Sequence, residues 1–172
     1  MQLSDSRTLD ANVETVWAAL LDPEVLKACV PGCQEMTGSA EEGFEAVVVQ
    51  KVGPVKATFK GAVQMSDRVE HESLTMTGEG KGGAAGFAKG GAKVRLEAQG
   101  DQTILHYDVE AKVGGKLAQL GSRIIDGFAK KMADQFFTNF QDAVGAPEDD
   151  ADAEETASDA PKKGWFKRLV SN

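Results

Sequence analysis

A change of hydrophobic periodicity at Gly114-Gly115 constrains the fold of this chain more than any other feature. From Cys33 to Val113 apolar and polar residues mostly alternate, with glycines at turn positions. This period of two is typical of antiparallel strands with one buried face. Beyond Gly115 apolar residues recur every three or four positions to about Ala143, which predicts one helix about 40 Å long. The sequence therefore predicts an α+β fold in which a curved antiparallel sheet wraps around a long C-terminal helix.

The helical stripe after Gly115 contains two glycines within its length. Its members are Leu117, Leu120, Gly121, Ile124, Phe128, Met132, Phe136 and Phe140. Gly121 and Gly127 each cost about 1 kcal/mol of helix stability relative to alanine, so we expect a close approach or a bend there.

Residues 12–28 show a second helical pattern. Asn12 is a plausible N-cap, Val16 and Trp17 belong to an apolar stripe, and Pro23 marks a break into a second short turn. No repeat of 20–50 residues is visible, which excludes solenoids and propellers.

Charge is distributed unevenly along the 172 residues. Residues 1–146 carry a net charge of −5, residues 147–161 carry −7 with no basic residue, and residues 162–172 carry +4. We expect one domain over 1–146, a disordered acidic linker over 147–161 and a short basic amphipathic tail over 162–172. Because nucleic-acid binding depends on clustered lysine and arginine, the net charge of −8 predicts no nucleic-acid partner.

The tail has the composition of an interfacial membrane anchor. Its apolar residues share one side of a helical wheel with basic residues beside them: Trp165, Phe166, Leu169 and Val170, next to Lys162, Lys163, Lys167 and Arg168. Eleven residues are too few for a stable helix in water, so folding on contact and weak reversible attachment are expected. The alternative is a tail that docks on a protein groove, such as one on an enzyme partner.

Several motifs in a fixed order carry a family resemblance over about residues 1–142. They are Val30-Pro31-Gly32-Cys33, Gly53-Pro54-Val55, Phe59-Lys60-Gly61, the glycine-rich segment Gly78 to Gly91, Thr103 to Tyr107, Gly115 to Arg123, and Phe136-Phe137. With the order β-αα-β-α, the chain resembles the CoxG family of carbon monoxide dehydrogenase subunits, which lies within the START-like (helix-grip, SRPBCC) superfamily.

The resemblance implies a helix-grip fold and a small non-catalytic protein without a covalent cofactor. Its implied partners are a molybdenum hydroxylase such as carbon monoxide dehydrogenase, a lipophilic small molecule, namely a respiratory quinone in the helix-grip cavity, and the inner face of the cytoplasmic membrane. The N-terminus lacks the basic and apolar regions of a secretory signal, so we expect a cytoplasmic protein attached peripherally to that membrane.

Inward positions of the strands and the helix supply the candidate ligand-binding residues. They are Phe59, Val63, Met76, Phe87, Leu96, Tyr107, Leu120, Ile124, Phe128 and Met132. Most of them are expected simply to pack. Tyr107, the only tyrosine, is the candidate to orient a quinone carbonyl. Phe87 is interpreted as a gate at the cavity mouth or as an anchor for a flexible hairpin.

The glycine-rich segment and the cysteines are interpreted as structural and not as ligand-binding or metal-binding sites. Gly78, Gly80 and Gly83 formally make G-x-G-x-x-G, but antiparallel flanks favour a hairpin with bulges over a dinucleotide site. Two sulfurs are too few for structural zinc, so Cys33 is expected to be a buried thiol and Cys29 a thiol at a helix end.

Two other functions stay open beside a ligand-binding recruitment protein. An enzyme of the same fold, such as a cyclase or hydrolase, needs charged or histidine side chains that point inward, and the alternation places Lys, Glu and His106 outward. An assembly factor for the same enzyme class without small-molecule cargo would have a filled interior.

Overall fold

The computed structural model describes residues 1–145, 161–164 and 167–171. Its elements are β1 (Gln2–Leu9), α1 (Val13–Leu20), α2 (Pro23–Cys29), β2 (Cys33–Ser39), β3 (Gly43–Val52), β4 (Val55–Val69), β5 (Ser73–Lys81), η1 (Gly83–Ala85), β6 (Phe87–Gln99), β7 (Gln102–Gly114), α3 (Lys116–Gln119), α4 (Ser122–Gly145), β8 (Pro161–Gly164) and β9 (Lys167–Ser171).

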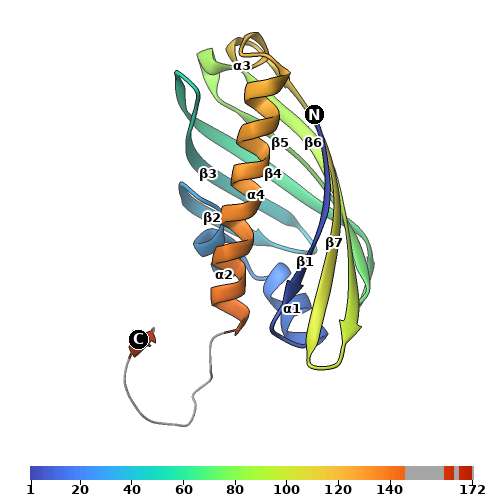
Figure 1. Cartoon of the computed structure of the whole chain (residues 1–172). Coiled ribbons are helices and arrows are strands. Elements are labelled where there is room, and N and C mark those ends of the chain that lie inside the picture. Colours follow the sequence, from blue (N-terminus) through green and yellow to red (C-terminus); the bar gives the residue numbers. More distant parts are fainter. Residues whose placement is uncertain (146–160, 165–166, 172) are drawn as a thin grey trace.

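One antiparallel sheet of seven strands, in the order β1-β7-β6-β5-β4-β3-β2, curves around α4 (Figure 1). Along β4, half-buried positions from Val55 to Met65 alternate with exposed ones, and β7 buries Thr103, Leu105 and Tyr107 on the same inner face. The predicted alternation and the predicted antiparallel sheet are confirmed.

The two short helices begin where the sequence predicts. The Asn12 side chain accepts a hydrogen bond of 2.9 Å from the backbone N–H of Thr15, which caps α1. Pro23 is the first residue of α2, where a missing backbone donor costs nothing, and Asp22 caps that helix.

The long helix is interrupted at Gly121, which separates α3 from α4. Gly121 has φ +89°, a left-handed conformation that glycine tolerates and other residues rarely adopt. A Cβ at Gly121 would meet nothing within 4 Å, so the backbone angle and not a close approach requires glycine there. Gly127 lies inside α4, and a Cβ there would also meet nothing within 4 Å, so no close approach occurs at Gly127.

The core consists of two separate clusters. The larger one contains Val16 and Trp17 of α1, Leu105 of β7 and Phe140 of α4. The smaller one contains Val52, Leu117 and Ile125, with Phe59, Leu120 and Phe128 packed against it. The two clusters lie at different levels along α4, since they use its end and its beginning respectively.

The predicted folding of the tail on contact with a membrane stays a prediction. Within the described residues β8 and β9 pair as a two-stranded antiparallel sheet. Trp165, Phe166 and the linker up to residue 160 lie outside the described residues, so the linker stays a prediction. In the described part of the chain, no helix combines the length and apolar character that a membrane span requires.

Candidate functional site

Helix α4 lies over the inner face of the sheet and is held mainly near its margins. Its principal contacts with strands are to β1, at one edge, and to β3, next to the other edge; it also packs on α2. Near its end, Asn139 donates a hydrogen bond of 3.0 Å to the backbone carbonyl of Cys29. The helix therefore spans the concave face, with the central strands β4 to β6 facing it from below (Figure 1).

Small residues stand in register on the inner face of these central strands. Gly61, Gly80 and Ala88 form one row across β4, β5 and β6, and Gly78, Gly90 and Ala111 form the adjacent row across β5, β6 and β7. A Cβ built on Gly80 would meet only Phe59 and Lys60 within 4 Å. The α4 side chains thus do not reach Gly80. We call the six residues of the two rows the small-residue floor.

The glycines of the floor lie within strands and not in a flexible hairpin. Strands β5 and β6 pair in continuous register from Ser73 opposite Arg95 to Lys81 opposite Phe87, so the bulges predicted for this hairpin are wrong. Only residues 82–86, around η1, form the connection. The antiparallel flanks agree with the interpretation that this segment is not a dinucleotide site.

Eight of the ten sequence-predicted ligand residues are buried or half-buried. Phe59, Val63, Leu120, Phe128 and Met132 are half-buried, and Met76 packs against the larger core cluster. Leu96 and Tyr107 are 7% and 5% exposed, inside that cluster. The five residues on strands lie on the inner face of the sheet. The set is divided between the two core clusters, with Met76, Leu96 and Tyr107 at the larger one and Phe59, Leu120 and Phe128 at the smaller one.

Two of the predicted inward residues are exposed. Phe87 is 40% exposed, because β6 turns its even-numbered residues inward; its ring lies against Gly114, its cross-strand neighbour. Ile124 is 42% exposed and lies beside Gly53, while Ile125 is buried. Ile124 lies in the first turn of α4, directly after the left-handed break at Gly121, and the continuous stripe did not anticipate that break.

An inward-pointing arginine was missed by the sequence interpretation. Arg7 Nη2 donates to Asp134 Oδ1 of α4 at 2.5 Å and to the Tyr107 hydroxyl at 3.3 Å. The guanidinium also lies over the Phe137 ring, 5.1 Å from its centroid, and that ring stacks on Tyr107. The signal was the alternation of β1, in which Leu3, Arg7 and Leu9 share the inner face.

We call Arg7, Tyr107, Asp134 and Phe137 the Arg7 cluster. One buried donor in this cluster has no protein partner among the described residues. Arg7 Nε is inaccessible and makes no hydrogen bond within the described residues. The hydrogen bond from Arg7, assisted by the charge of Lys130, holds the pKa of Asp134 below its usual range. The sequence analysis considered only Lys, Glu and His and did not anticipate this inward pair.

We expect the ion pair of Arg7 and Asp134 to make stability depend on pH. The unfolded chain has the ordinary, higher pKa at Asp134, so the stabilisation is complete above about pH 4 and disappears as the pH falls through the lowered folded value. In urea unfolding, Asp134→Asn should be less stable than wild type at pH 7, and the two midpoints should converge in acid. A difference between the two urea midpoints that stays constant from about pH 7 to pH 2 would contradict the ion pair as the origin of the pH dependence.

Cys29 is the last residue of α2, as predicted, and is buried, whereas Cys33, predicted to be buried, is only half-buried. Cys29 is 0% exposed, and burial, with a smaller effect of Asp142, raises its pKa to about 11. Cys33 is half-buried, donates to the Glu35 carbonyl at 3.2 Å and has a pKa that burial raises. Among residues 1–145, no group of three or more His, Cys, Asp or Glu residues is placed to hold a metal ion.

We expect the native protein to expose one reactive thiol per chain. At about pH 8 an aromatic disulfide reagent should label Cys33, whereas Cys29 should react at least roughly tenfold more slowly because it is buried and protonated. Absorbance of the released thiolate measures both rates. Cys33→Ser should abolish the fast phase; fast labelling of that variant would contradict the placement of Cys29.

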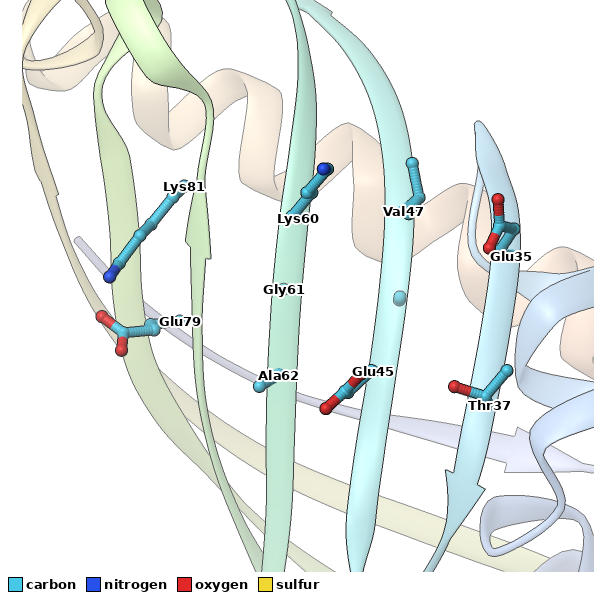
Figure 2. Close-up of a pocket in the computed structure, with 10 residues that line it drawn as sticks. Glu35, Thr37, Glu45, Val47, Lys60, Gly61, Ala62, Glu79 and Lys81 are labelled. Carbon is cyan, nitrogen blue, oxygen red and sulfur yellow. The ribbon is translucent and has the colours of Figure 1, made fainter.

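Two hollows lie on the outer face of the sheet, away from α4. One, of about 360 Å³, is lined by residues of β2 to β5, among them Lys60, Lys81, Glu45 and Glu79 (Figure 2). The other, of about 600 Å³, lies over β1, β7, β6 and β5 and includes His106, whose ring nitrogen lies 3.0 Å from Glu97. Charged residues line both, so neither resembles a site for a lipophilic ring.

Comparison with known proteins gives one family and a common fold. The family model for CoxG, a subunit of carbon monoxide dehydrogenase, matches residues 6–145. A search of curated proteins found no match.

Solved structures share the architecture over most of the chain. A conserved protein from Geobacillus kaustophilus is 28% identical, with a TM-score of 0.79 over 84% of this chain and 95% of that one. A START superfamily protein from Mycobacterium smegmatis is 14% identical, with a TM-score of 0.65 over 84% of this chain and 97% of that one. The START-like fold expected from the sequence is confirmed.

Proposed function

Because this chain belongs to the CoxG family of carbon monoxide dehydrogenase subunits, we propose that it is a non-catalytic accessory protein that binds a lipophilic ring compound between α4 and the sheet. The compound proposed is a respiratory quinone. The protein recruits a molybdenum hydroxylase, such as carbon monoxide dehydrogenase, to the cytoplasmic membrane, where its tail attaches.

The observation that carries the ligand proposal is the small-residue floor under α4. At Gly80 a Cβ would meet Phe59 and no atom of α4 within 4 Å, and the side chains of Phe59 and, on the facing helix, Phe128 are only half-buried. Apolar walls over a floor without side chains suit a flat, largely apolar ring. An assembly factor with a filled interior would not need such a floor.

The Arg7 cluster supplies a polar end for the same ligand. Arg7 Nε–H has no protein partner in the described residues, and the Tyr107 hydroxyl, which accepts from Arg7, keeps its own proton to donate. An unpaired buried donor is costly, and a quinone carbonyl would satisfy it. This supports Tyr107 as a ligand residue and adds Arg7 to it.

The test is extraction of lipophilic compounds from protein purified from its native host, followed by mass spectrometry. About one quinone per chain is expected, and Arg7→Met should lower its recovery. Wild-type protein that is empty and does not take up added quinone would overturn the carrier proposal and favour assembly without cargo. Co-purification of the hydroxylase measures recruitment separately, so the two halves of the proposal can fail independently.

A further inference from the structure

Three stretches of chain that are far apart in sequence meet at one end of the domain, around the beginning of α4 (Figure 1). They are residues 51–61 at the β3–β4 hairpin, residues 80–90 around η1, and residues 111–125 from β7 through α3. Every charged residue in them is basic: Lys51, Lys56, Lys60, Lys81, Lys89, Lys112, Lys116 and Arg123. The rest of residues 1–146 holds seven basic and twenty acidic residues. We call these three stretches the basic end.

The lysines of the basic end are set directly against one another. Cross-strand register pairs Lys51 with Lys56, Lys60 with Lys81, and Lys89 with Lys112; the acidic neighbours are Glu79, opposite Lys89 on β5, and Glu45, which shares the outer hollow with Lys60 and Lys81. Like charges opposite each other destabilise a sheet. All eight basic residues are exposed, and none of them forms an ion pair with another described residue. Lysines placed opposite one another, without ion-pair partners, therefore favour a binding partner that supplies many negative charges at once.

Two large apolar side chains are exposed at the same end. Phe87 is 40% exposed and lies opposite Lys81 in the register of β5 and β6, and Ile124 is 42% exposed beside the β3–β4 turn. Apolar side chains surrounded by lysines are typical of surfaces that enter the headgroup region of a bilayer. A nucleic acid would use the lysines but would leave Ile124 without a partner.

We propose that the basic end binds the surface of an anionic lipid bilayer. This second membrane contact belongs to the folded domain and goes beyond the anchor proposed for residues 162–172. It extends the proposed membrane role without depending on the tail, because its charges and exposed apolar residues lie within residues 51–125. With the basic end facing the bilayer, the beginning of α4 and the half-buried Leu120 and Phe128 lie close to the lipid.

The experiment measures sedimentation of the full chain with vesicles of phosphatidylcholine containing about 30% phosphatidylglycerol, an anionic lipid. A parent variant carries Lys162→Gln, Lys163→Gln, Lys167→Gln and Arg168→Gln, which removes the tail charge. The test variant adds Lys56→Gln, Lys60→Gln and Lys81→Gln to the parent. The matched control adds Lys27→Gln, Lys93→Gln and Lys131→Gln, three lysines outside the basic end. Urea midpoints verify that all variants fold alike.

The parent should still bind the anionic vesicles and should not bind pure phosphatidylcholine. Each neutralised lysine of the basic end should weaken binding about fivefold, so the test variant should lose on the order of a hundredfold while the control stays within about fivefold of the parent. A parent that does not bind, or equal losses in test variant and control, would overturn the proposal. So would a parent that binds duplex DNA more tightly than the vesicles through the same three lysines. Failure here leaves quinone extraction, and therefore the proposed function, intact.

Discussion

Phe140→Ala is expected to lower the free energy of unfolding by about 3–5 kcal/mol, the usual cost of truncating a fully buried phenylalanine. Phe140 is 0% exposed and its ring stacks on Phe136 at a centroid distance of 5.7 Å. It belongs to the larger core cluster together with Leu105 and Val16. Removing the ring leaves a cavity where α4 meets α1 and the sheet, so a urea titration should show a markedly lower midpoint.

Two further variants of α4 test whether the loss of stability in Phe140→Ala comes from lost packing. Phe140→Leu keeps part of the buried volume and should lose less than half as much stability as Phe140→Ala. Lys131→Ala changes an exposed residue of the same helix and should stay within about 0.5 kcal/mol of wild type. If Phe140→Ala also stayed within about 1 kcal/mol, the end of α4 would not be the fixed support that the structure indicates.

Gly80→Leu is expected to remove nearly all bound quinone, with a loss of at least roughly tenfold in recovery or in affinity. The new side chain would extend from the small-residue floor toward α4, and its Cβ would be in ordinary contact with Phe59 at 3.8 Å. Because Gly80 does not have a positive φ, leucine can adopt the backbone conformation of the strand. Fluorescence titration with a soluble short-chain quinone measures the change.

The matched control for Gly80→Leu is Thr77→Leu on the same strand. Thr77 is exposed on the outer face of β5, so an added apolar side chain there leaves the interior unchanged. This variant should bind quinone as wild type does. Equal loss in both variants would indicate damage to β5, and unchanged binding in both would place the ligand away from the floor.

The period of the apolar residues was enough to predict the architecture. Alternation depends on which face of a strand is buried, and the 3.6-residue stripe depends on which side of a helix is buried, so each could be read locally. Asn12 and Pro23 were found for the same reason, because a helix start needs a cap and tolerates proline.

The errors arose where a single residue changes the local geometry. The left-handed angle at Gly121 interrupts the predicted helix, and in the first turn of α4 after it Ile125 is buried and Ile124 exposed. Phe87 follows a tight connection whose length sets the face on which it lies. Arg7 was missed because the inner face of β1 tolerates an arginine only when Asp134, far along the chain, pairs with it. The alternation of β1 indicates that Arg7 faces inward, but a local pattern cannot show that Asp134 pairs with it.

The length of α4 sets a reach requirement for the chain that follows it. Its 24 residues measure about 36 Å, with the basic end at its beginning and the exit to the tail at its end. The fifteen residues of the predicted linker, 147–161, could span at most about 50 Å, which exceeds the length of α4. If the tail and the basic end bind the same bilayer as proposed, a spacer of half this length could not join them, and only one of the two contacts could form at a time.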